Sequence, residues 1–253
     1  MIFDTHAHYD DEQFDGDRDE LLQSMPDFGV GTIVDVSATY ESCEKVLTLA
    51  GKYPHVYAAI GVHPDEVGEL NEDKIQHMKE LCCNKKVVAV GEIGLDYYWD
   101  NEPHEVQQKW FIRQLELAGE VKKPVIIHSR EAAADTMYIM KNYAQGLDGV
   151  IHCYSYSREM AEEYVKMGFY IGIGGVVTFK NAKKLKDVAA AIPIEKIVLE
   201  TDCPYMAPEP YRGKRNQSSY IRYVAEKIAE LKEMSPEEVI AVTEKNARDL
   251  YGI

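Results

Sequence analysis

The feature that most constrains the fold is a repeated alternation of short apolar runs with longer stretches of helical character. The runs are rich in β-branched residues and nearly continuous in hydrophobicity, which is typical of strands that are covered on both faces. Eight such runs are present, at residues 2–5, 32–36, 56–60, 87–90, 125–127, 149–151, 169–173 and 197–199. The alternation predicts parallel strands connected by helices.

Amphipathic segments lie between these runs. From Glu105 to Val121 apolar side chains recur at roughly helical spacing, and the segments 40–50, 131–143, 157–167 and 181–190 have the same character. Near the end of the chain, Ser235-Pro236-Glu237-Glu238 combines a helix N-cap, a proline at the first helical position and an acidic first turn. We expect the helix that begins there to end near Tyr251-Gly252.

Strands and helices that alternate in this way predict an α/β fold, a single-domain (β/α)₈ TIM-type barrel over residues 1–253. A doubly wound open sheet is the alternative. The barrel is favoured because unusual polar residues follow many of the strand runs. In a barrel, the loops after the strands converge on one rim, where catalytic groups collect.

Composition excludes several classes of protein. The chain has 28 basic and 43 acidic residues and a formal net charge of −15, which argues against a passive nucleic-acid coat protein. It leaves open an enzyme whose bound cations meet phosphate locally. The five cysteines form no C-x-x-C pair, so neither a disulfide framework nor a structural zinc finger is expected. No long apolar run and no signal peptide are found, so we expect a cytoplasmic protein without a membrane or obligate protein partner.

Histidines and carboxylates are placed at the ends of the predicted strands. Five of the eight histidines are found there, joined by two acidic residues: His6, His8, His63, His128, His152, Glu92 and Asp202. Since the ends of these strands meet at one rim, the pattern predicts a metal centre. The other histidines, His55, His77 and His104, are in helical or loop contexts and are expected to be structural.

The number of candidate ligands predicts two divalent metal ions. In His6-Ala7-His8 the two imidazoles are alternate residues of an extended chain, so both can face one cation. Two cations about 3.5–4 Å apart need a shared ligand, and Glu92 is the natural bridge. The first metal would then have His6, His8, Glu92 and Asp202, and the second Glu92, His128 and His152. Imidazole and carboxylate suit Zn, Mn, Fe or Ni, and Mg is retained as a candidate although it prefers oxygen ligands.

These residues lie in stretches that resemble the TatD family of metal-dependent deoxyribonucleases, within the amidohydrolase-like superfamily. The matching stretches are Asp4-Thr5-His6-Ala7-His8, Gly61-Val62-His63-Pro64, Gly91-Glu92-Ile93-Gly94-Leu95-Asp96-Tyr97, Ile127-His128-Ser129-Arg130, His152-Cys153-Tyr154-Ser155, Glu200-Thr201-Asp202-Cys203-Pro204-Tyr205 and Arg212-Gly213-Lys214-Arg215-Asn216. The resemblance implies a TIM-type barrel, a two-metal site and hydrolysis of nucleic-acid phosphodiesters, with DNA as the expected substrate and 3′-5′ exonuclease action. Two positions depart from the family pattern, Tyr156 and the pair Gln217-Ser218, and both bear on substrate preference.

The expected chemistry is attack of an activated water on phosphorus. Asp202 would orient the water and accept its proton, Glu92 would bridge the metals, and His63 and Arg212 would hold the scissile phosphate or the leaving oxygen. Arg212 belongs to a basic loop with Lys214 and Arg215 on an otherwise acidic chain. Further expected substrate-binding residues are Tyr154 and Asn216, with Tyr205 and Tyr211 as other stacking faces.

Other activities use similar ligands. A two-metal amidase or lactonase and an ester hydrolase acting on aminoacylated tRNA both remain open on the same barrel. A non-catalytic, metal-dependent binding module is the alternative from a different class. Turnover of a phosphodiester, compared with turnover of amides and esters, separates these possibilities.

Overall fold

A computed structural model describes residues 1–99 and 101–253 of the chain. Its eight strands form one parallel sheet in which the strand order is the chain order, as predicted for the barrel. The strands are β1 (Ile2–Ala7), β2 (Val30–Val36), β3 (Val56–Ile60), β4 (Val87–Asp96), β5 (Val125–Arg130), β6 (Gly149–Ile151), β7 (Tyr170–Ile173) and β8 (Ile197–Leu199). The helices are α1 (Arg18–Ser24), α2 (Ser42–Lys52), α3 (Glu72–Leu81), α4 (His104–Val121), α5 (Ala133–Tyr143), α6 (Arg158–Lys166), α7 (Lys183–Ala191), α8 (Ile221–Lys232) and α9 (Pro236–Tyr251).

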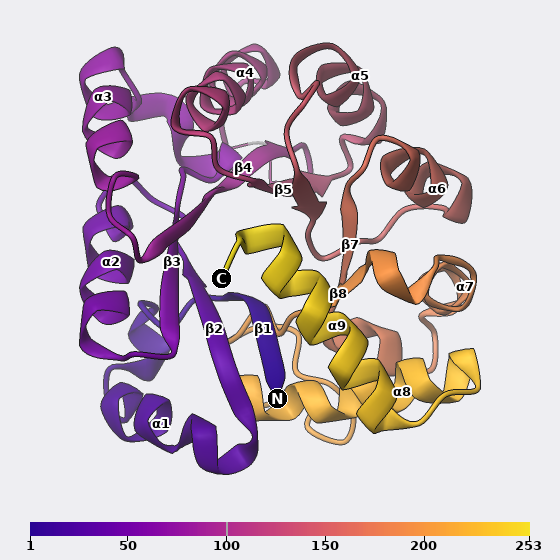
Figure 1. Ribbon diagram of the computed structural model, residues 1–253. Helices are drawn as coiled ribbons and strands as arrows, with labels where there is room; N and C mark the ends of the chain where they lie inside the picture. Colours follow the sequence, from indigo (N-terminus) through magenta and orange to yellow (C-terminus); the bar gives the residue numbers. More distant parts are fainter. Residues whose placement is uncertain (100) are drawn as a thin grey trace.

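The sheet closes between its first and last strands. Asp202 N–H donates to the His6 carbonyl at 2.9 Å, and His8 N–H donates to the Cys203 carbonyl at 2.8 Å. A β-bridge also joins Ala7 to Cys203. The helices surround the strands on the outside (Figure 1). Closure therefore places the segment that contains Asp202 directly beside the end of β1.

Strands β4 and β5 extend further than their apolar runs indicated. The run at 87–90 predicted a strand that ends before Glu92, but β4 continues to Asp96, and β5 continues through His128 to Arg130. The extensions pair with each other, with Gly94 opposite His128 and Asp96 opposite Arg130. Polar residues that include the candidate ligand His128 therefore lie within the ladder, where backbone hydrogen bonds fix their positions.

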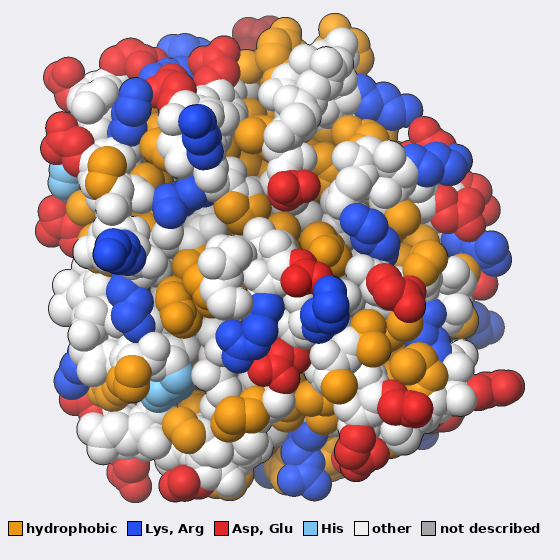
Figure 2. Space-filling model, viewed as in Figure 1, with side chains coloured by type: hydrophobic (Ala, Val, Ile, Leu, Met, Phe, Trp, Pro, Cys, Tyr) orange, Lys and Arg blue, Asp and Glu red, His pale blue; other side chains and the backbone are white. Residues whose placement is uncertain are grey.

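Helix α9 closes the opposite end of the barrel. It begins with the expected capping box between Ser235 and Glu238 and ends at Gly252, which has a left-handed φ of 69°. Ala247, Leu250 and Tyr251 pack with apolar side chains of the strands. In Figure 1 this helix lies across the barrel, and on the same face Figure 2 shows basic and acidic side chains interspersed. This face shows no patch of one charge sign that would attract a charged ligand. The other end of the barrel, where the strands finish, is therefore the candidate site.

Within the described part of the chain, every helix is too short or too polar to cross a lipid bilayer.

Candidate metal centre

The expected ligands converge inside the end of the barrel where the strands finish. His6, His8, Glu92 and His152 are buried, and His128 and Asp202 are partly buried. They come from β1, β4, β5 and the segments that follow β1, β6 and β8. Five of the six also line a cavity of about 1250 Å³, which gives the cluster access to a substrate: His8, Glu92, His128, His152 and Asp202. His63 lines the same cavity.

The two oxygens of Glu92 face different pairs of histidines. Glu92 Oε1 lies 2.7 Å from His128 Nδ1 and 2.8 Å from His152 Nε2. Glu92 Oε2 lies 3.5 Å from His6 Nε2 and 3.8 Å from His8 Nε2. One carboxylate thus stands between two imidazole pairs, which is the arrangement that a bridging ligand requires.

Asp202 lies on the His6 and His8 side of this carboxylate. Its Oδ1 is 3.7 Å from His6 Nε2 and 3.5 Å from His8 Nε2. Asp202 has a φ of 58°, a left-handed conformation that costs a non-glycine residue energy and is concentrated at functional sites. The hydrogen bond from its N–H to His6 holds this conformation, so the backbone is set to aim the carboxylate at the histidine pair.

Hydrogen bonds outside the cluster orient two of the imidazoles. His8 Nδ1 lies 2.8 Å from the Val36 carbonyl, to which it donates, so Nε2 is directed at Glu92 and Asp202. On the other side, His128 Nε2 lies 3.0 Å from Asp96 Oδ2 while its Nδ1 faces Glu92. Such partners fix the ring orientation of metal-binding histidines in proteins.

The donor set fits divalent cations. His6 Nε2 and His8 Nε2 are 3.0 Å apart, so two ring nitrogens and two carboxylate oxygens converge on one small volume. His6 Nδ1 and His152 Nδ1 are buried without a hydrogen-bond partner. The groups that could hold an ion include His6, His8 and Glu92; His6, His152 and Asp202; and His63, Glu92 and His128. Imidazole and carboxylate together suit first-row divalent metals.

The pKa shifts describe a network of charged imidazoles around a carboxylate. Burial alone would raise the pKa of Glu92, but the charges of His152 and His6 and hydrogen bonds from His128 and His152 hold it well below its usual range. Burial would lower the pKa of His152, yet the charges of Glu92 and Glu200 raise it well above its ordinary value. Burial, together with the charge of His152, lowers the pKa of His6. The proton on His152 thus balances the acidic groups in the place that a cation would take.

Three acidic or imidazole groups extend the cluster beyond the predicted ligands. His63, expected to hold phosphate, is grouped with Glu92 and His128 and also with Asp65 and Asp96 as a possible ligand set. No role was predicted for Asp65 or Asp96 from the sequence. For Asp96, sequence spacing could have indicated a place in the cluster. It is four residues beyond Glu92, and side chains at even spacing share one face of a strand.

His63 is held as a neutral imidazole. Burial, and next the charge of His128, lower its pKa to about 3. Its Nδ1 accepts the Asp65 N–H at 3.2 Å, so the ring proton is on Nε2. Its ring centroid is 4.4 Å from that of His128. His63 can therefore donate one hydrogen bond into the site, but it brings no positive charge.

The residues expected to bind substrate have different environments. Arg212 is exposed, with its guanidinium 4.2 Å from the Phe179 ring centroid. It lines a second cavity of about 460 Å³ that shares Tyr205 and Met206 with the larger one. The structure therefore places Arg212 next to the ligand cluster's cavity and not among that cavity's lining residues. Tyr205 is 48% exposed and stands between the two cavities.

Three other expected substrate contacts are occupied by the protein itself. Asn216 is fully buried, and its amide group donates to the Thr201 and Tyr205 carbonyls at 2.8 Å each. Tyr154 is buried, and its hydroxyl donates to the Ser157 carbonyl at 2.6 Å. Tyr211 stacks on Tyr220, with ring centroids 4.2 Å apart. These side chains thus hold the loops of the rim, and Tyr154 also lines the main cavity.

The histidines expected to be structural are placed elsewhere. His55 Nε2 lies 3.0 Å from the Leu22 carbonyl, and His77 Nδ1 lies 2.9 Å from the Tyr40 hydroxyl. The ring of His104 stacks on Tyr97 with centroids 3.5 Å apart. None of these three histidines belongs to a candidate ligand group among the described residues.

A parallel eight-stranded barrel with a histidine and carboxylate cluster at the ends of its strands defines the class as a metal-dependent hydrolase on a TIM-type barrel. A family model described as TatD related DNase matches residues 3–252. The chain belongs to this family.

Known proteins of similar sequence and structure agree with this assignment. The metal-dependent hydrolase YabD of Bacillus subtilis is 45% identical over 254 residues, which cover 100% of both chains. The metal-dependent hydrolase TatD of Mycobacterium tuberculosis is 33% identical over 263 residues, which cover 100% of this chain and 98% of the relative. The crystal structure of YjjV, a TatD homolog from Escherichia coli K12, superposes with a TM-score of 0.93 at 33% identity, covering 100% of this chain and 98% of that one.

Proposed function

We propose that this protein is a nuclease that hydrolyses phosphodiester bonds of DNA, removing nucleotides from a 3′ end, with two divalent cations in the site. The observation that carries the proposal is the position of Glu92, with one oxygen toward His6 and His8 and the other toward His128 and His152. The family description, TatD related DNase, supports phosphodiesters as substrate.

When bound, the cations would activate a water molecule for attack and neutralise charge that develops on the phosphate oxygens. His6, His8, Glu92 and Asp202 would hold one ion, and Glu92, His128 and His152 the other. The additional acidic groups Asp65 and Asp96 carry no ligand role in this proposal, since Asp96 is engaged in orienting His128.

The chain's own residues then move the proton and position the phosphate. Burial opposes ionisation of Asp202, but the hydrogen bond from His8 and the charges of His152 and His6 keep its pKa below the usual range, so it is ionised at neutral pH. It can accept a proton from the attacking water. His63 donates its Nε2–H to the phosphate or the leaving oxygen. Arg212, in the neighbouring cavity, binds the next phosphate along the strand.

The test is digestion of end-labelled DNA by protein that has been stripped of metal and reloaded with a series of divalent cations. Release of mononucleotides from the 3′ label, restored only by metal, is the expected result. The same preparations are assayed on a panel of amides, lactones and an aminoacylated tRNA. Faster turnover of any of these than of DNA would replace the nuclease with the corresponding hydrolase.

A further inference from the structure

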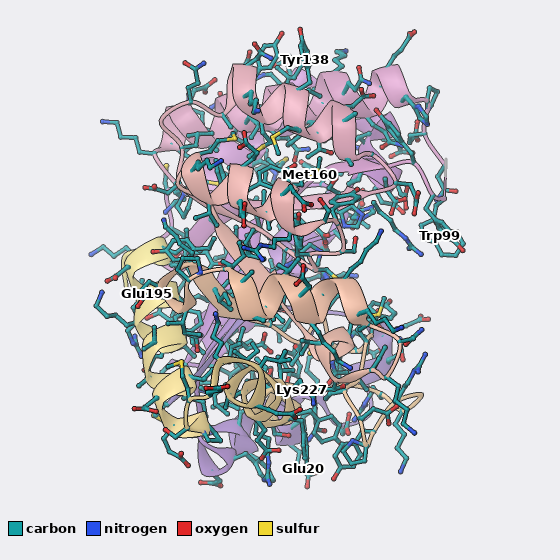
Figure 3. The ribbon with its side chains drawn as sticks, turned by 90° about the vertical axis from the view of Figure 1, so that its right-hand side faces the viewer. Glu20, Trp99, Tyr138, Met160, Glu195 and Lys227 are labelled. Atoms are coloured by element: carbon teal, nitrogen blue, oxygen red, sulfur yellow. The ribbon has the colours of Figure 1, made fainter. Side chains whose placement is uncertain are left out.

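Two large aromatic side chains are exposed on the rim of the main cavity. Tyr98 and Trp99 are the second and third residues after β4 and are 54% and 58% exposed. Their rings meet edge to face with centroids 5.0 Å apart. Trp99 lines the same cavity as Glu92 and His128. Figure 3 shows Trp99 standing clear of the body on the side opposite α9. Adjacent exposed aromatics beside a site are typical of a surface that a ligand covers.

The aromatic pair is anchored to the ligand cluster. Asp96 Oδ1 accepts the Tyr98 N–H at 2.8 Å and the Trp99 N–H at 3.3 Å. The other oxygen, Asp96 Oδ2, lies 3.0 Å from His128 Nε2. One buried carboxylate therefore positions both a candidate metal ligand and the backbone of the pair, which fixes the aromatic surface relative to the reaction centre.

A cation lies over the same surface. Arg130, two residues beyond His128, ends β5. Its guanidinium carbon is 3.9 Å from the Tyr98 ring centroid and 5.5 Å from that of Trp99. Arg130 also lines the cavity. A flat aromatic face with a cation beside it matches a nucleotide, because the base can stack while the phosphate meets the positive charge.

We propose that Trp99, supported by Tyr98 and Arg130, stacks an unpaired base of the nucleic-acid substrate next to the scissile phosphodiester. This inference rests on the proposed nuclease function and names its substrate class. In an intact duplex the bases are already stacked and paired, so this surface is available only to a single strand or an unpaired end. Stacking on an aromatic face tolerates every base, so no sequence preference is expected.

Binding can be measured directly because the chain has two tryptophans, Trp99 and Trp110, and Trp110 is only 5% exposed. A single-stranded phosphorothioate oligonucleotide, which resists hydrolysis, is titrated into the full-length protein. Tryptophan emission should be quenched in the parent and in the control Tyr138→Ala, and unchanged in Trp99→Phe. Tyr138 is a matched control because it is 66% exposed on α5, away from the cavity (Figure 3). No quenching in the parent overturns the proposal.

Kinetics separate stacking from a structural role of Trp99. For a single-stranded oligonucleotide, Trp99→Ala should lower kcat/KM about 5- to 100-fold, the change that corresponds to one stacked base. Trp99→Phe keeps an aromatic face and should lose far less. An abasic strand of equal length should be cleaved equally by parent and Trp99→Ala. Equal losses on both strands would overturn the proposal. If the parent quenches but cleaves neither strand, the nuclease function fails and the stacking surface stands.

Discussion

At the scale of single residues, Glu92 is the position on which the proposed two-metal arrangement depends. Because each of its oxygens faces one histidine pair, its loss should disturb both ion sites, whereas loss of His152 should disturb one. We therefore expect Glu92→Ala to retain less metal than His152→Ala, with Glu92→Gln intermediate because a neutral amide bridges two cations poorly. Elemental analysis of matched preparations measures this, and full metal content in Glu92→Ala would contradict the bridging role.

Asp202 allows proton transfer to be separated from metal binding. Asp202→Asn keeps the shape and one carbonyl oxygen, but an amide does not accept a proton at neutral pH. A positioned general base contributes about 10²–10⁴-fold, so kcat should fall by that factor while KM changes little at saturating metal. Metal content must be measured in the same preparation. A fully loaded variant within about threefold of the parent would remove Asp202 from the role of base.

Asp4 gives the fold a pH dependence of unusual sign. Burial raises its pKa to about 7, despite hydrogen bonds from Ser218 and Thr201. The folded state therefore holds this proton more tightly than the unfolded chain, whose aspartates titrate near about 3.9. The resulting stability is present at low pH and is lost as pH rises through about 7.

Asp4→Asn removes this titration. In urea unfolding with chelator present, the parent should lose stability relative to the variant between about pH 5 and about pH 7, and the difference should level off above about pH 8. Titration of the histidines is common to both proteins and cancels in the comparison. A difference that is independent of pH, or that shrinks as pH rises over this range, would contradict the assignment.

At the scale of secondary-structure elements, the sequence predicts what depends on apolar periodicity. All eight strands and the helices at 104–121 and 236–251 lie where the pattern indicated. Helices α1, α3 and α8 were not predicted. The sequence of α3 is polar, with Ile75 and Met78 as its buried residues, whereas α8 has a buried apolar face that was overlooked. The extension of β4 to Asp96 was also missed, since glycines and acidic residues interrupt the apolar run that marks a strand.

The same limit applies to the loops of the candidate site. Strand-end position was enough to select the histidines and Glu92, because parallel strands converge at one rim. Loop residues follow no such rule. Asn216 and Tyr154 match the family pattern, yet hydrogen bonds to backbone carbonyls engage both side chains inside the rim. Nothing in the sequence around Trp99 marks it as a binding residue. Its exposure beside the cavity is visible only in the folded structure.

The loop that contains Arg212 should bind the nucleic-acid strand away from the scissile bond. Because Arg212 lines the second cavity, Arg212→Ala should weaken binding of an oligonucleotide by about 1.5–3 kcal/mol and leave a minimal phosphodiester unaffected. Arg222→Ala is the matched control, since Arg222 is also exposed and lies 5.1 Å from the Tyr223 ring centroid. Equal loss on both substrates would instead place Arg212 at the scissile phosphate.

At the scale of the whole molecule, a net charge of −15 has to be reconciled with the proposed polyanionic substrate. On the rim, only a few basic side chains line the two cavities among the described residues. These are Lys45, Arg130, Lys183 and Lys184 in the main cavity, and Arg212, Lys214 and Arg215 in the second one. The opposite face mixes both signs (Figure 2). The protein should therefore contact few phosphates of a bound nucleic-acid strand, because the rest of its acidic surface repels the strand.

Few phosphate contacts predict a weak dependence of binding on salt. For a single strand, the slope of log K against log salt concentration is about −0.7 for each neutralised phosphate, so two or three contacts give a slope of about −1.4 to −2.1. Fluorescence titrations with the phosphorothioate strand at several salt concentrations measure this slope. Arg212→Ala should make this slope shallower by about 0.7, because one phosphate contact is lost. Trp99→Ala, measured with a labelled oligonucleotide, should weaken binding but leave the slope unchanged, because stacking releases no counterions. A parent slope steeper than about −4 would mean that the strand contacts a far larger basic surface than these two cavities provide.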